Sequence, residues 1–257
     1  IINIDISDSV TSIDSYAFES CIGLTNVKIP NNVKTIGEGA FKGCNNLTSI
    51  SLPFVGLSRT SNNSKYAVFG YIFGSTTTSV NGTTCQFYNS LGSMSYYYIP
   101  SNLKTITITD ATTIPIGAFN NCINILSITI PDSVTNIDEL AFYGCTGLTR
   151  LYIPKGVKSF KGNALQNCQE LVDIEVSKDN PYYDSRDNCN AIVETSTDTL
   201  VAGCNNTIIT NNIKNIGNYA FSYCRGITNI IIPNSVTIIG HSVFKECINL
   251  ESITIPE

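Results

Sequence analysis

The residues of this 257-residue chain that could do chemistry are ten cysteines, one histidine and 20 acidic side chains. Cysteines can bind metal as thiolates, form disulfides or act as nucleophiles. A histidine can serve as a general base, and two carboxylates across a cleft can hydrolyse a glycosidic bond. Each of these chemistries needs a particular spacing, so the spacing decides among them.

Seven of the ten cysteines recur at one position of a repeated motif. Each lies three residues after a two-residue apolar mark, and the period within blocks is 23 residues. No C-x-x-C pair occurs, which disfavours a zinc site. We expect these thiols to fill the inward slot of successive coils as small hydrophobic groups, with a disulfide ladder as the alternative. The seven are Cys21, Cys44, Cys122, Cys145, Cys168, Cys224 and Cys247.

The other three cysteines, Cys85, Cys189 and Cys204, lie off this period. Cys189 and Cys204 flank the segment NAIVETSTDTLVAG, which reads as a strand, a tight turn and a second strand. The two thiols could therefore face each other across a hairpin, either bridged or free.

The repeated unit predicts a stack of short coils. Residues 24–44 read L-x-x-V-x-I-P-x-x-V-x-x-I-G-x-x-A-F-x-x-C. The alternation in LTNVKIP predicts a short strand that ends at proline, and NVKTIG predicts a turn and a second extended piece. EGAFKGC suits one helical or 3-10 turn that directs phenylalanine and cysteine inward. One such unit cannot bury its apolar face alone, so neighbouring coils must cover both sides.

Residues 130–154 (IPDSVTNIDELAFYGCTGLTRLYIP) and 232–256 (IPNSVTIIGHSVFKECINLESITIP) show which known repeat this unit is similar to. They resemble the BspA-like leucine-rich repeat of surface proteins from anaerobic bacteria and some parasitic protists. The resemblance covers nearly the whole chain apart from two interruptions. It implies an α/β leucine-rich-repeat solenoid, right-handed and strand-rich with short helical or 3-10 turns, exported and displayed at the cell surface. It also implies adhesion to host matrix proteins or other cells.

Two interruptions divide what we otherwise expect to be a single solenoid over residues 1–257, cut from a longer protein. The first, at about 53–100, is rich in Tyr, Phe, Gly and Ser. It could project as a contact surface, or it could be two degenerate coils that pack aromatic residues inward. The inward candidates are Phe54, Phe69, Tyr71, Phe73 and Phe87. The second, at about 176–210, reads as a variant repeat that contains a hairpin.

Other residues that could bind metal or act in catalysis have structural explanations. Asp179, Asp184 and Asp187 could hold calcium, but the spacing of an EF-hand loop is absent and DNPYYD is good turn chemistry by itself. His241 occupies a variable turn column, which favours an exposed side chain over a catalytic one. No H-E-x-x-H or G-x-S-x-G motif occurs. We therefore predict no enzyme activity, no cofactor and no metal, with a hydrolase as the least favoured alternative.

The residues between the inward positions of each predicted strand should form one extended outer surface, the kind that solenoids use for partners. This surface is mostly Ser, Thr and Asn, apart from a cluster at Arg150, Tyr152, Asp173 and Glu175 and the more distant Lys28. Arginine and tyrosine are common hot-spot residues, so we predict these five as ligand-binding. The alternative is that Arg150 only pairs with one of the two acids.

Charge and hydropathy limit the partners. The net charge is −5 and no Lys/Arg run occurs, which argues against nucleic acid and anionic lipid. No apolar run approaches the roughly 20 residues that span a membrane. We expect a secreted or surface-displayed monomer that binds proteins or glycans, with host extracellular matrix among the candidate partners; a stiff spacer between other domains is the alternative.

Overall fold

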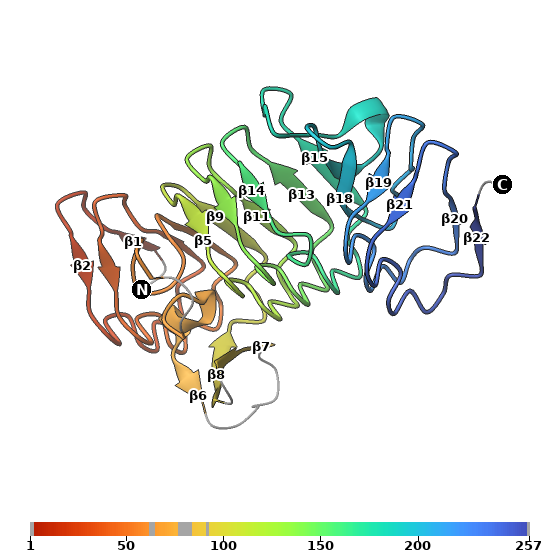
Figure 1. Cartoon of the computed structure of the whole chain (residues 1–257). Helices are drawn as coiled ribbons and strands as arrows, with labels where there is room; N and C mark the ends of the chain where they lie inside the picture. Colours follow the sequence, from red (N-terminus) through yellow and green to blue (C-terminus); the bar gives the residue numbers. More distant parts are fainter. Residues whose placement is uncertain (1–2, 62–64, 77–83, 91–92, 256–257) are drawn as a thin grey trace.

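The chain winds into a strand-rich solenoid with its two ends at opposite ends of the stack (Figure 1). The structure is a computed structural model, and it describes residues 3–61, 65–76, 84–90 and 93–255. Each ordinary coil contributes one strand to a first face, a two-residue strand to a second face and a turn to a third. The solenoid architecture and its strand-rich character predicted from the sequence are confirmed.

The first face is a run of parallel strands whose register follows the 23-residue period except across the first interruption. Asn26 pairs with Ser49, Ser49 with Thr105 and Arg150 with Asp173, so equivalent residues of successive coils lie side by side. In the inner coils the central apolar residue of each strand is buried and its neighbours point outward, whereas Ile253 of the last strand is exposed. The strands of the first face are β1 (Asn3–Asp5), β3 (Asn26–Lys28), β5 (Ser49–Leu52), β9 (Thr105–Ile108), β11 (Ser127–Thr129), β13 (Arg150–Ile153), β15 (Asp173–Val176), β20 (Asn229–Ile231) and β22 (Ser252–Thr254).

The second face is built from shorter strands, most of which bury one isoleucine or phenylalanine each. It is parallel except in the variant repeat, where a hairpin adds antiparallel strands. The strands of the second face are β2 (Ser12–Ile13), β4 (Thr35–Ile36), β10 (Thr113–Ile114), β12 (Asn136–Ile137), β14 (Ser159–Phe160), β16 (Tyr183–Asp184), β17 (Ala191–Glu194), β18 (Thr199–Gly203), β19 (Asn215–Ile216) and β21 (Ile238–Ile239).

The third face consists of hydrogen-bonded turns rather than the helical turns expected from EGAFKGC. In six coils both the residue before the Ala/Val of the apolar mark and the residue before the cysteine have positive φ, as at Gly39 and Gly43. Two left-handed residues within five positions interrupt any right-handed helical run. These turns still join the coils, because the N–H of Phe119 donates to Ala141 O at 2.7 Å and that of Phe142 to Ala164 O at 2.9 Å.

The repeated cysteine joins neighbouring coils as well as filling space. The Sγ of Cys145 donates to Phe119 O at 3.1 Å and that of Cys168 to Phe142 O at 3.2 Å, each across to the preceding coil. Nine cysteines are free thiols, Cys189 and Cys204 among them, so the hairpin carries no disulfide in this structure. The side chain of Cys85 lies outside the described residues.

The first interruption is one coil with a projecting unit, not two degenerate coils. Because β5 pairs directly with β9, only a single coil separates Cys44 from the coil of Cys122. The antiparallel strands β6 (Ser75–Thr76), β7 (Thr84–Ser90) and β8 (Ser93–Ile99) project from the stack beside this coil (Figure 1).

A 3-10 helix, η1 (Phe69–Phe73), replaces the missing turn in that coil. The N–H of Phe41 donates to Ile72 O at 2.8 Å, and the N–H of Phe69 donates to Ala118 O at the same distance. Four of the five aromatic residues predicted to point inward are buried; the side chain of Phe87 lies outside the described residues. The four are Phe54, Phe69, Tyr71 and Phe73.

Alkaline pH should destabilise the stack. Burial raises the pKa of Cys44 to about 11 and holds those of Cys122, Cys145 and Cys168 well above the ordinary thiol value. A thiol with a raised folded-state pKa stabilises fully below its unfolded pKa, about 8.5, and loses that contribution as pH rises through the folded value. The urea midpoint should stay constant from about pH 6 to 8 and fall between about pH 9 and 11. Cys145→Ala should show a smaller fall; an equal fall would remove thiol burial as the cause.

Glycine should be preferred at the left-handed position before the cysteine. Glu246 is exposed there with φ 60°. The left-handed conformation costs an L-residue roughly 1–2 kcal/mol, and glycine loses about 0.5–1 kcal/mol to backbone entropy. Glu246→Gly should therefore raise the free energy of unfolding by about 0.5 kcal/mol, measured by urea denaturation. Glu251→Gly, at an exposed site without positive φ, should lower it; the opposite ranking would contradict this account.

Candidate ligand-binding site

Four of the five predicted ligand-binding residues lie together on the first face. Arg150 and Tyr152 project from β13, and their register partners on β15 are Asp173 and Glu175. The Nη2 of Arg150 lies 2.6 Å from Oδ2 of Asp173, and the side chain of Arg150 is 74% exposed. Tyr152 is 46% exposed, which leaves its ring open to solvent on a face of mostly small polar residues.

Lys28 does not join this cluster. It lies on β3, which pairs with β1 and β5. Three first-face strands, β5, β9 and β11, separate β3 from β13, which places it about 19 Å away at the usual strand spacing. It borders a separate depression of about 300 Å³ with Asp5, Asp8 and Pro30.

The first-face sheet is interrupted immediately after the cluster. β15 pairs with β13 on one side only, and the next first-face strand, β20, pairs with β22. Side chains of the variant repeat take the place of the missing partner. The N–H of Ile174 donates to Oδ1 of Asn190 at 2.6 Å, and the N–H of Val176 donates to Oγ of Ser185 at 3.1 Å. The edge of β15 is therefore capped by side chains rather than by backbone.

A groove of about 620 Å³ runs along this capped edge. One wall is β15 with Ser177 and Lys178, and the other is the segment around η2 (Arg186–Asn188). Within the described part of the chain, the carboxylate of Glu175, the ammonium of Lys178 and the amide of Asn188 make no hydrogen bond or ion pair. The groove thus presents polar groups that are not committed to protein partners.

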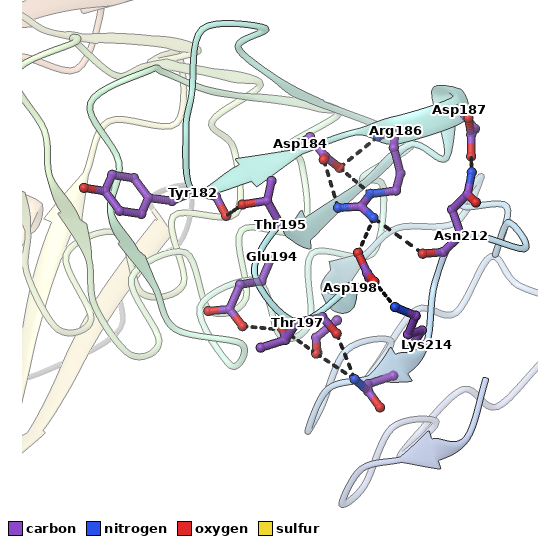
Figure 2. A network of polar contacts seen from close by, with 12 residues as sticks. Tyr182, Asp184, Arg186, Asp187, Glu194, Thr195, Thr197, Asp198, Asn212 and Lys214 are labelled. Carbon is purple, nitrogen blue, oxygen red and sulfur yellow. Dashed lines mark hydrogen bonds and ion pairs between the residues drawn. The ribbon is translucent and has the colours of Figure 1, made fainter. Parts of the chain in front are cut away.

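A network centred on Arg186 fixes the second wall (Figure 2). The guanidinium binds Oδ1 and Oδ2 of Asp184 at 2.9 and 3.0 Å and Oδ1 of Asp198 at 2.5 Å. Lys214, from the following coil, lies 2.7 Å from the other oxygen of Asp198. The Lys214 ammonium and the Arg186 guanidinium hold the pKa of Asp198 below its usual range. The network ties the η2 segment to the next coil.

Two of the three acidic residues considered for calcium, Asp184 and Asp187, bind protein partners here instead, and Asp179 lies outside this network. Asp184 pairs with Arg186, and Oδ2 of Asp187 accepts from the amide of Asn212 at 2.7 Å (Figure 2). No group of three or more His, Cys, Asp or Glu residues among the described positions could hold a metal ion.

The η2 segment is the part of the site that the sequence analysis missed. Asp187, Asn188 and Asn190 all have positive φ, near 55°. Asp and Asn tolerate the left-handed region better than other non-glycine residues, so the RDNCN sequence was a signal for a tight reversal. The reversal brings Asn190 back to the edge of β15, where the hydroxyl oxygen of Ser185, the residue just before η2, also accepts a hydrogen bond.

His241 lies far from the groove in the sequence and makes local contacts. It is exposed, its Nε2 is 3.1 Å from Oγ of Ser242, and its ring meets Tyr219 edge-on at 5.3 Å. No carboxylate among the described residues orients its ring, as a serine–histidine nucleophile would need.

The stacked parallel strands and the 23-residue register define a leucine-rich-repeat solenoid. The model of the BspA-type leucine-rich repeat region matches residues 1–67, 89–194 and 198–257 in six copies. The chain belongs to this family. The described part of the chain contains no helix long and apolar enough to cross a membrane.

Solved structures agree with this assignment. A leucine-rich cell surface protein from Faecalibacterium prausnitzii is 28% identical over 96% of this chain, with a TM-score of 0.58. The pneumococcal vaccine antigen PcpA, 18% identical over the whole chain with the same TM-score, shares the fold. The chain spans 59% of the length of each of these two proteins. No curated protein matches it in sequence.

Removing Arg186 should loosen the second wall of the groove. Arg186→Ala removes charged hydrogen bonds to Asp184 and Asp198 from a side chain that is only 20% exposed. We expect a loss of about 1–2 kcal/mol in unfolding free energy and faster amide hydrogen exchange at the segment from Ser185 to Asn190.

The matched control is Arg150→Ala, which breaks a well-exposed ion pair and should cost less than about 1 kcal/mol. Equal losses for the two variants, or unchanged exchange near η2, would contradict the proposed role of Arg186.

Proposed function

We propose that this chain is a ligand-binding module of a cell-surface protein, which engages a protein or glycan partner through its first face. The observation that carries the proposal is the exposed Tyr152, set among Arg150, Asp173 and Glu175 on a face whose other outward side chains are mostly small and polar. Aromatic and arginine side chains supply much of the energy at binding surfaces, while small polar residues contribute complementarity.

Two further observations support this proposal. The relative from Faecalibacterium prausnitzii is described as a cell surface protein. The Arg150–Asp173 pair is exposed, so a partner can displace it at little cost in stability. A partner that met this cluster would also reach the groove, because Glu175 belongs to both.

Binding should depend on the cluster. Biolayer interferometry of the chain against immobilised fibronectin, fibrinogen, collagen and mucin glycans at physiological salt should find saturable binding to at least one ligand. The double variant Arg150→Ala/Tyr152→Ala should weaken that binding at least about tenfold, since both side chains are hot-spot types.

The double variant Ser127→Ala/Thr129→Ala on β11 is the control, because it alters the same face outside the cluster and should leave affinity unchanged. Unchanged affinity in the Arg150/Tyr152 variant would remove the cluster from the binding surface. If no ligand on the panel binds, and an unrelated rod of equal length can replace this segment in a longer surface protein without loss of function, the segment acts as a spacer.

A further inference from the structure

The groove beside β15 has a lining that limits what it can bind. Its two apolar residues, Ile174 and Val176, are 2% and 5% exposed, so they do not form a pocket for an apolar side chain. The rest of the lining consists of carboxylates, amides, hydroxyls and two basic groups. A protein partner would anchor poorly here, since hot-spot anchors fill well-packed, desolvated pockets.

An added peptide strand is also disfavoured. A strand that extended the sheet would need the free N–H groups on the edge of β15. The N–H groups of Ile174 and Val176 already donate to Asn190 and Ser185. Displacing these caps would break further bonds, because Ser185 Oγ also donates to Ala191 O at 2.8 Å and Asn190 Nδ2 to Val172 O at 2.7 Å.

The charges of the groove nearly cancel. Asp173 is paired with Arg150, and Asp184 is paired with Arg186. What remains is the carboxylate of Glu175 against the ammonium of Lys178, with the neutral amide of Asn188 on the opposite wall. An anion would be attracted by Lys178 and repelled by Glu175, and a cation the reverse, so neither charge gains much and the lining favours a neutral ligand with many hydroxyls.

We propose that this groove binds a neutral oligosaccharide. The proposal rests on the function proposed above and names a ligand class for the same face. A carboxylate and an amide can each hydrogen-bond two sugar hydroxyls, and Lys178 can donate to a hydroxyl or ring oxygen. Tyr152, the register partner of Glu175, offers an exposed ring against which the C–H face of a sugar can pack.

The size of the groove agrees with a short oligosaccharide. Its volume of about 620 Å³ lies within the range of about 300–1,000 Å³ that small-molecule sites occupy. The segment that forms its second wall is fixed by the Arg186 network, so the polar groups are held in place before a ligand arrives.

The test is a titration of the ¹⁵N-labelled chain with lactose, maltotriose and mannotriose, followed by amide chemical shifts to about 10 mM sugar. At least one sugar should give saturable shifts confined to residues 150–153, 173–178 and 184–190. Sialyllactose, which carries a carboxylate, should bind no more tightly than lactose, because its attraction to Lys178 is offset by its repulsion from Glu175.

Variants separate the site from the rest of the face. Tyr152→Ala and Glu175→Ala should each weaken sugar binding about tenfold, and Glu175→Gln less, because the amide retains hydrogen-bonding capacity. Thr129→Ala, on the same face outside the groove, should have no effect. All three residues are exposed at the sheet surface, and an unchanged amide spectrum verifies that each variant folds.

Several outcomes would overturn the proposal: no saturable shift with any of the three neutral sugars, shifts elsewhere in the molecule, or full affinity in Glu175→Ala. Binding of a trilysine peptide in place of the sugars would assign the groove to basic peptides. If a protein ligand binds and depends on Arg150 and Tyr152 while no sugar does, the saccharide proposal fails and the proposed function stands. If neither binds, both fail.

Discussion

Each coil of this protein depends on hydrogen bonds to the coils on either side. Backbone donors on all three faces, and the thiol of the repeated cysteine, reach carbonyl oxygens of a neighbouring coil. The requirement explains why the apolar residues recur at a fixed period, since a shift of one residue would turn a strand's buried side chain to solvent. It also explains why cysteine suits its slot: a thiol is small and apolar enough for the core and still donates a weak bond.

The variant repeat shows what happens when one coil fails to supply a strand to the first face. The backbone groups of β15 that lost a strand partner are satisfied by Asn190 and Ser185. Two side chains fill less space beside β15 than a paired strand would, so a groove forms along the edge that they cap. The candidate site thus results from the capping of β15 by side chains of the variant repeat. The Arg186 network fixes the segment that carries these side chains (Figure 2).

The sequence predicted the features that follow from its period. The alternation in each strand and the spacing between repeats placed Arg150 beside Asp173 and Tyr152 beside Glu175, and the register agrees. It could not predict the groove, because the caps are two side chains of the variant repeat, Ser185 and the Asn190 that a left-handed reversal at residues 187–190 returns to β15. For the first interruption it left open a projecting surface or two inward-packed coils, and the structure combines one inward-packed coil with a projecting unit. The FGYIF segment lacks the repeated motif, yet the carbonyls of its 3-10 helix accept the same bonds from the preceding coil.

The projecting strands β7 and β8 leave and re-enter the stack at a coil that is already closed by the direct pairing of β5 with β9. The first-face sheet of the solenoid therefore continues through this position, and β7 and β8 form a separate sheet. Insertions at this position therefore leave the register of the repeat unchanged. The same position is a suitable insertion site for displaying a foreign epitope or tag on the solenoid.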